Sequence, residues 1–223
     1  PNGYRQVQTD ASGYYTATYG DLPRGGDGTV RYETQVTYAT VVFRRSFRAP
    51  DLVLTVNYGH DWVEGNYEAG HTIRITVTNS GGVIKGIAAL TSEGGWFQTG
   101  GAWITEYPDI APGDWIHGLV DNGYTSTVRV GAISGDVSAA SDSISGTVDA
   151  AWWLPQTVDV QCHAWGAPWW APNPQRKEDT VLPNGTDSYA CAWNPATEWD
   201  VQPGQDIAVQ YYEPDGDSVY NVF

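Results

Sequence analysis

The chain has 223 residues, of which 41% are hydrophobic, so it can bury roughly three quarters of its unfolded surface as one large β domain or two small ones. Its formal net charge is −15 at neutral pH, which argues against nucleic acid and anionic lipid as partners, because phosphate binding needs a basic surface. No apolar run approaches the roughly 20 residues of a membrane helix, and 26 Gly, 13 Pro, 11 Trp and 14 Tyr are typical of an aromatic, turn-rich β protein.

The first 50 residues differ in charge from the rest of the chain. Residues 1–50 carry six arginines against four acidic residues, so their net charge is +2 and that of the remaining 173 residues is −17. Two alternating stretches, "GYYTATYG" and "TVRYETQVTYATVVFRR", lie on either side of the turn "LPRGGDG" and predict strands. Pro1 and the lack of any Met lead us to expect a processed chain whose leader was removed.

Residues 2–20 are a candidate donor arm. Such a strand pairs with the sheet edge of a neighbouring copy, and opposite charge steers it there. The alternative is two ordinary strands with solvent-facing arginines. If the arm is a donor, we expect the assembly interface to contain Tyr4, Tyr14, Tyr15, Arg44, Arg45 and Arg48.

From residue 51 onward, period-two alternation predicts half-buried strands. In "HTIRITVTN", Ile73, Ile75 and Val77 share one face. "STVRVGAI", "TVDVQC" and "DIAVQYY" follow the same pattern, and turns such as "NSGG", "DNG" and "PDGD" separate the runs. No amphipathic helix is evident. The sequence therefore predicts an all-β fold, a β-sandwich of Ig-like or jelly-roll-like type.

Two motifs occur twice in the same order. D-x-[VI]-x-G stands at 61–65 and 142–146, and a Trp followed by D-[IV]-x-P-G stands at 103–113 and 193–204. The repetition predicts two duplicated β-units, 51–129 and 130–223, after an N-terminal strand segment 1–50. We expect structural roles: Pro-Gly makes a tight turn, Asp109 and Asp200 accept hydrogen bonds from the turn amides, and the Trp covers the core.

The second unit carries a Trp- and Pro-rich insertion, 163–190, between its cysteines. Trp165, Trp169 and Trp170 form a candidate ligand platform, because tryptophans on a stiff loop suit stacking on sugar rings; the alternative is a lid over the core. Cys162 and Cys191 predict a disulfide in an exported protein, with two buried free thiols as the alternative. "NGT" makes Asn184 a candidate glycosylation site.

Metal and catalytic motifs are weak. "GHDWVEGNYEAGH" holds His60, Asp61, Glu64, Glu68 and His71, but the histidines are eleven apart, whereas a zinc-protease helix needs them four apart. Asp215 and Asp217 in "EPDGDS" are candidate calcium ligands, and solvated turn aspartates are the commoner explanation. No nucleophile elbow, P-loop or dinucleotide motif is present. We therefore expect no enzyme and no cofactor other than calcium.

The repeated D-x-[VI]-x-G and D-[IV]-x-P-G motifs resemble the repeat units of large exported surface proteins of environmental bacteria. In organisation, the N-terminal arm is similar to strand-donating pilus and biofilm-fibre subunits. These resemblances imply an extracellular, cell-surface structural protein that assembles with copies of itself into a filament or layer. The alternative is a carbohydrate-binding or adhesive β-sandwich module, and a hydrolase with scattered carboxylates has the least support.

Overall fold

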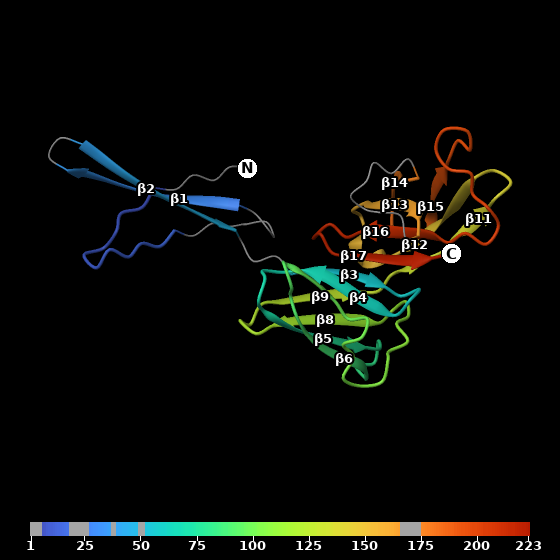
Figure 1. Ribbon diagram of the computed structural model, residues 1–223, viewed down its shortest axis with the longest axis horizontal. Coiled ribbons are helices and arrows are strands. Elements are labelled where there is room, and N and C mark those ends of the chain that lie inside the picture. The colour runs from blue at the N-terminus through green and yellow to red at the C-terminus, as the bar shows by residue number, and fades with distance from the viewer. Residues whose placement is uncertain (1–5, 18–26, 37–38, 49–51, 166–174) are drawn as a thin grey trace. The chain divides into compact units, whose positions relative to one another are not determined.

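The computed structural model of the chain describes residues 6–17, 27–36, 39–48, 52–165 and 175–223 (Figure 1). The chain divides into two compact units, Pro1–Asp51 and Leu52–Phe223. The described residues contain strands, turns and one short 3-10 helix, η1 (Ala151–Trp153), and no α-helix. The all-β prediction is therefore confirmed.

In the first unit, two strands form one antiparallel hairpin. Strand β1 (Asp27–Val36) pairs with β2 (Ala39–Arg48) along its whole length. Residues 6–17 form no strand; instead the Asp10 carboxylate accepts hydrogen bonds from the amides of Ser12 and Tyr14, at 2.8 and 2.9 Å. The strand predicted from "GYYTATYG" is thus wrong for its described residues, because a strand needs a paired neighbour and local turn bonds are formed instead.

The first half of the second unit holds seven strands in two layers. The strands are β3 (Val53–Asn57), β4 (Trp62–Asn66), β5 (Thr72–Thr78), β6 (Ile84–Thr91), β7 (Trp96–Gln98), β8 (Trp115–Val120) and β9 (Thr125–Arg129). Strands β3, β4 and β7 lie in one layer, and β5, β6, β8 and β9 form the other.

The second half repeats the same pairings. Its first two short strands together correspond to β3, because both pair with the strand that corresponds to β4. The six strands that follow have the same pairings as β4 to β9, in the same order. The strands are β10 (Ala132–Ile133), β11 (Asp136–Ser138), β12 (Ser143–Asp149), β13 (Val158–Ala164), β14 (Lys177–Val181), β15 (Asn184–Ala192), β16 (Ile207–Tyr212) and β17 (Ser218–Val222). Strand β14 and most of β15 lie inside the predicted insertion 163–190, so part of that stretch is regular sheet. A common origin of the halves by duplication stays a prediction.

One parallel strand pair joins the halves. Strand β17 pairs with β3 through Ser218↔Thr55, Val219↔Val56 and Tyr220↔Asn57, and Figure 1 shows these strands side by side. A single seven-stranded sheet, in the order β14-β13-β16-β17-β3-β4-β7, therefore crosses both halves. Behind it lies one continuous hydrophobic cluster with residues from each half. The predicted boundary at 129/130 thus falls inside one compact unit.

The repeated motifs bind to each other in the same way in each half. The Asp61 carboxylate accepts a hydrogen bond from the amide of Ile110 at 2.7 Å, and Asp142 accepts one from Val201 at 2.8 Å. Both aspartates have positive φ, 59° and 47°. The hydrogen-bond acceptor role predicted for Asp109 and Asp200 of the second motif therefore belongs to Asp61 and Asp142 of the first motif. These two aspartates lie close to the turns before β8 and β16.

The last residue of the D-x-[VI]-x-G motif marks a close backbone approach. A Cβ at Gly65 would collide with the carbonyl oxygen of Val53, and one at Gly146 with that of Ser134. The predicted covering role of the second motif's Trp also holds in the second half, where Trp193 is buried and packs edge-on against Trp199. The motifs therefore describe packing inside each sandwich.

Gly146→Ala should destabilise the fold by about 3 kcal/mol, because the new methyl group meets rigid backbone. Gly101→Ala is the matched control: nothing lies within 4 Å of its added Cβ, so we expect a change within about 0.5 kcal/mol. Urea unfolding followed by Trp fluorescence measures both. Equal midpoints for the two variants would show that the close approach is not needed.

Candidate functional site

One face of the seven-stranded sheet is polar and aromatic, and it lies opposite the hydrophobic core. Paired residues of neighbouring strands point to the same side of a sheet. One row of pairs runs Gln161, Gln210, Tyr220, Asn57, Trp62 across β13, β16, β17, β3 and β4. The adjacent row holds Asp159, Tyr212, Ser218, Thr55, Glu64 and Gln98. We call these two rows, together with His163 and Trp165, the polar face.

The middle of the polar face is buried although its residues are polar. Asn57 and Ser218 are 0% and 2% exposed, and Tyr220 is 5% exposed without belonging to the core cluster. Hydrogen bonds satisfy these groups: the Thr55 and Ser218 hydroxyls lie 2.9 Å apart, and the Gln210 amide donates to Ser218 at 2.8 Å. This network fixes the two halves against each other where the sheet crosses between them.

An aromatic cluster lies on this face and draws on both halves. The Trp165 ring stacks on His60 with centroids 4.8 Å apart, and meets Trp62 and Tyr220 at 6.2 and 6.0 Å. We call these four residues the aromatic cluster. The Asn57 side chain holds His60: its Oδ1 accepts a hydrogen bond from the His60 backbone amide at 2.9 Å, and its Nδ2 lies 3.3 Å from the ring nitrogen Nδ1. Trp165 was predicted as part of a ligand platform; Trp169 and Trp170 lie outside the described residues.

Glu64 is the acidic group beside the cluster, two residues after Trp62 on β4. It is half-buried, and burial raises the pKa of its carboxyl group. Burial raises the pKa of the Tyr220 phenol too, and the negative charge of Glu64 adds to that effect. Among the described residues, the Glu64 carboxylate has no hydrogen-bond or ion-pair partner. It is a hydrogen-bond acceptor available to a ligand.

His163 extends the polar face on β13. Burial, with the positive charge of Arg176 as a lesser cause, lowers the pKa of His163 to about 4. The ring is therefore uncharged at neutral pH. Its Nδ1 atom is buried without a hydrogen-bond partner in the described part of the chain.

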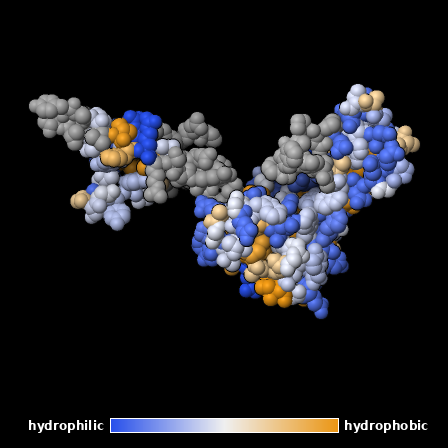
Figure 2. Space-filling model, in the orientation of Figure 1, coloured by the Kyte–Doolittle hydropathy of each residue, from blue (hydrophilic) through white to orange (hydrophobic). Residues whose placement is uncertain are grey.

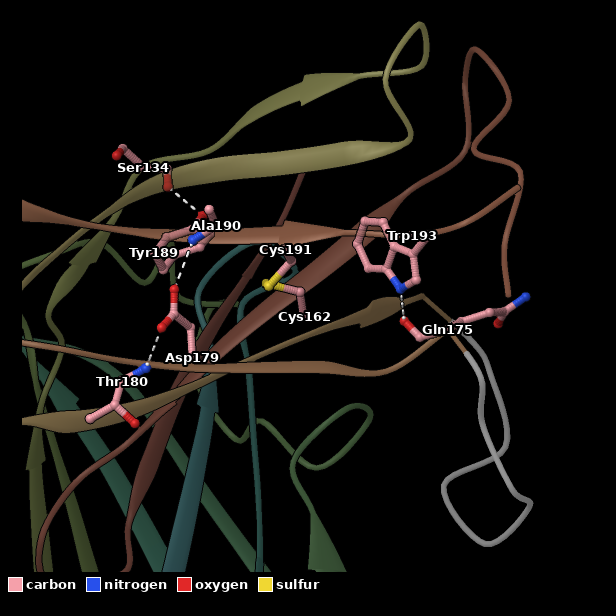
Figure 3. Close-up of a disulfide and its surroundings, with 9 residues drawn as sticks. All are labelled: Ser134, Cys162, Gln175, Asp179, Thr180, Tyr189, Ala190, Cys191 and Trp193. Atoms are coloured by element: carbon pink, nitrogen blue, oxygen red, sulfur yellow. Dashed lines mark hydrogen bonds between the residues drawn. A yellow bond between two sulfur atoms is a disulfide. The ribbon is translucent and has the colours of Figure 1, made fainter. Parts of the chain in front are cut away.

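A disulfide anchors the strand that carries Trp165. Cys162 on β13 is bonded to Cys191 on β15, which lies in the other layer of the second half (Figure 3). Both cysteines are buried in the core. Nearby, the Trp193 indole N–H donates to the carbonyl oxygen of Gln175 at 2.6 Å. The covalent link between layers thus holds the end of β13 in place just before His163 and Trp165.

The acidic turn between β16 and β17 is a second candidate site. Glu213, Asp215 and Asp217 place one carboxylate oxygen each within 4.8 Å of one another. Asp217 is buried and already accepts hydrogen bonds from the Leu54 amide at 2.8 Å and the Ser126 hydroxyl at 2.9 Å. Burial, together with the charges of Asp215 and Asp217, raises the pKa of Glu213 to about 8. Calcium binding by Asp215 and Asp217 stays a prediction, in which an ion would displace the Glu213 proton.

The other predicted site residues do not gather in one place. Tyr14, Tyr15 and Arg44 are exposed in the first unit. Tyr4, and the side chains of Arg45 and Arg48, lie outside what the structure describes. The side-chain oxygen Oδ1 of Asn184 accepts hydrogen bonds from the backbone amides of Thr186 and Asp187, each at 2.8 Å. Glycosylation of Asn184 stays a prediction.

Sequence reasoning missed the roles of His60, Trp62, Glu64 and Tyr220. His60 and Glu64 entered it only within a discounted metal group, whose other histidine, His71, instead contacts Asp121 at 2.7 Å. A signal was nevertheless present. In "DVQCHAW" the residues that alternate with the core positions are Asp, Gln, His and Trp, and in "WVEGN" they begin with Trp and Glu. Polar and aromatic residues on one side of neighbouring strands indicate a face that does more than contact solvent.

Comparison with known proteins gives structural likenesses alone. No protein-family model and no curated protein matches the chain. Similar solved structures include the BSP domain of a biofilm-associated protein, at 17% identity and a TM-score of 0.27, covering 77% of this chain and 28% of that one. A tetra-tandem repeat from the extending region of a large adhesion protein has 16% identity and a TM-score of 0.26, and the match covers 96% of this chain and 64% of that one. A structure from a 1.5-MDa bacterial ice-binding adhesin has 11% identity and a TM-score of 0.25, and the match covers 78% of this chain and 62% of that one.

The chain thus spans between 28% and 64% of those three structures. At such TM-scores, binding has to be argued from the residues of this chain. The described residues also include no helix with the length and hydropathy needed to cross a membrane.

Glu213→Gln should remove a pH-dependent loss of stability. The pKa of Glu213 is raised from 4.5 to about 8 in the folded state, so its contribution is fully present below pH 4.5 and is lost as the pH rises through 8. We expect the wild type to lose on the order of 4 kcal/mol between pH 5 and pH 9 from this group, and the variant to lose none of it. Urea unfolding across this pH range measures the difference.

Glu106→Gln, at an exposed loop position, is the control and should follow the wild type. If Glu213→Gln also follows the wild type, Glu213 does not hold its proton in the folded state. Repeating the series with calcium tests the ion: a calcium-dependent gain confined to the wild type and the control would support the predicted site.

Proposed function

We propose that the chain is a non-enzymatic, extracellular adhesive module that binds polysaccharide on the polar face through the aromatic cluster. The observation that carries this proposal is the gathering of His60, Trp62, Trp165 and Tyr220 on one side of the shared sheet. Aromatic rings offer flat apolar surface for the faces of sugar rings. The Glu64 carboxylate beside them supplies a directional hydrogen-bond acceptor that selects a ligand.

The position of the cluster supports a binding role over a core role. Trp165 and Trp62 are half-buried and His60 is exposed, and all four rings lie on the side of the sheet away from the core cluster. Because the cluster draws residues from both halves, it exists only when the shared sheet is formed. A ligand that bridges the rings would therefore bind the folded unit alone.

The extracellular assignment is supported by the disulfide and the charge. Disulfides persist in oxidising compartments and are rare in the cytosol, and Cys162–Cys191 is buried in a core position. Figure 2 shows a largely hydrophilic surface over residues 52–223 on the face in view. The formal net charge of −15 is far enough from zero to favour solubility.

The distance of Glu64 from the acids at the other end of the sheet supports binding without hydrolysis at the aromatic cluster. Glycoside hydrolases place two carboxyl groups about 5–9.5 Å apart. On the polar face, Glu64 on β4 and Asp159 on β13 are separated by β3, β17 and β16. Four strand spacings of about 4.8 Å put them roughly 19 Å apart. These two carboxylates are too distant to act together on one glycosidic bond.

Trp165→Ala should weaken polysaccharide binding about five- to thirtyfold, because stacking on one aromatic side chain contributes roughly 1–2 kcal/mol. A panel of polysaccharides titrated against intrinsic Trp fluorescence, followed by calorimetry on those that quench it, measures binding. Trp165→Phe keeps a ring and should retain part of the affinity.

Trp115→Ala is the control, since Trp115 is also half-buried but lies on β8 in the separate four-stranded sheet. Unchanged affinity in Trp165→Ala would exclude the aromatic cluster as the binding site. Loss of affinity in Trp115→Ala alone would move the site to the other sheet.

Assembly into a filament or layer is a second candidate function, and one observation favours it. The β1–β2 hairpin is a two-stranded sheet in a unit of its own, with Tyr32, Val42 and Phe43 exposed. An isolated two-stranded sheet is only marginally stable in water, and its open edges can pair with other strands. The positive charge of residues 1–50 against the acidic remainder would steer the hairpin toward another copy.

Deleting residues 2–20 should leave a folded but monomeric protein if that segment donates a strand. Negative-stain electron microscopy and the mass in solution compare the deletion variant with the full chain. Fibres from the full chain alone are the expected result. A deletion variant that still polymerises would exclude residues 2–20 as the donor, and a monomeric full chain would exclude self-assembly.

A further inference from the structure

We propose that the polysaccharide is cationic: it carries free amino groups, and one ammonium group binds Glu64 between the rings of the aromatic cluster. This inference rests on the proposed function and names the chemical class of its ligand. It excludes neutral and uronic-acid polysaccharides as the preferred partners.

Glu64 is the first part of the argument. Its strand β4 places it on the polar face in register with Thr55, one row from the Asn57↔Trp62 pair. The side chain is half-buried, and no described residue offers it a hydrogen bond or a positive charge. A carboxylate in such a place loses hydration without compensation. A ligand cation supplies the missing partner, and a charge-assisted hydrogen bond to it is stronger than a neutral one.

The aromatic rings are the second part. Trp62 is two residues from Glu64 on the same strand, and Tyr220 lies close enough for the charge of Glu64 to raise its pKa. Trp165 contacts both of these rings at centroid distances of 6.2 and 6.0 Å. Indole and phenol rings attract an ammonium group through their negative faces. Rings around a carboxylate are therefore suited to an amine, whereas a neutral sugar needs the rings alone.

The surrounding charge is the third part. The charged side chains in the two rows of the polar face are Asp159 and Glu64. The positive charge of Arg176 acts on His163 and Tyr212, on β13 and β16, and is not among the influences on Glu64. Glu178 on β14 continues the first row, where it accepts a hydrogen bond from Gln161 at 3.3 Å. Beyond residue 50 the chain carries a net charge of −17. This field attracts a polycation and repels a polyanion.

The test compares three oligosaccharides of equal length by calorimetry at about pH 6: a glucosamine oligomer, its fully N-acetylated counterpart and a uronic-acid oligomer. We expect the wild type to bind the glucosamine oligomer at least about tenfold more tightly than the acetylated one, and the uronic-acid oligomer not at all. Glu64→Gln should lower the affinity for the glucosamine oligomer about tenfold and leave the acetylated one unchanged. Asp136→Asn removes an exposed acid on β11, in a different sheet, and should change neither.

The outcomes separate the two proposals. If the acetylated oligomer binds as well as the amine, or Glu64→Gln has no effect, the cationic ligand is wrong while polysaccharide binding stands. If Asp136→Asn weakens binding as much as Glu64→Gln, the attraction is general charge and the Glu64 site is wrong. If no oligomer or polysaccharide binds, or Trp165→Ala binds all of them normally, the proposed function fails as well. Thermal unfolding of each variant confirms that it is folded.

Discussion

The parallel pairing of β17 with β3 is the contact on which the second unit depends. Three residue pairs close it, and the Asp217 carboxylate reinforces it by accepting the Leu54 amide of β3 and the Ser126 hydroxyl of β9. Without this contact, each half would be a small sandwich with an open sheet edge, which is a hazard for aggregation. With it, two edges disappear and a single core extends behind a sheet of seven strands.

Joining the sheets also changes the environment of the side chains on the opposite surface. Residues such as Asn57 and Ser218 would be ordinary solvent-facing groups at the edge of a lone sandwich. In the shared sheet they are buried, and a buried polar group without a partner costs about 1–3 kcal/mol. The hydrogen bonds among Thr55, Ser218 and Gln210 avoid that cost and are formed across the junction. The same closeness brings Trp165 onto His60 and Trp62.

Local sequence pattern predicted those parts of the fold that depend on residues close together in the sequence. Alternation identified β5, β9 and β16, and the presence of two cysteines in an apparently exported chain indicated their disulfide. The doubled motifs were correctly interpreted as packing elements, although the hydrogen-bonding aspartate was placed in the second motif instead of the first. The aromatic cluster could not be predicted, because Trp62 and Trp165 are about a hundred residues apart and meet only through strand register. Trp165 alone was identified, from its unusual setting among prolines.

Chain connectivity explains why only one sheet of the second unit crosses both halves and carries a polar face built from each. A parallel pair needs a crossover of a dozen or more residues between its strands. Strands β3 and β17 stand at opposite ends of the unit and meet this condition. The other two layers, one from each half, could join only through a parallel pair of β9 with β10. These strands are separated only by residues 130 and 131, so the chain cannot turn back to pair them in parallel. The halves therefore share one sheet, and a ligand surface that needs residues from both can form only there.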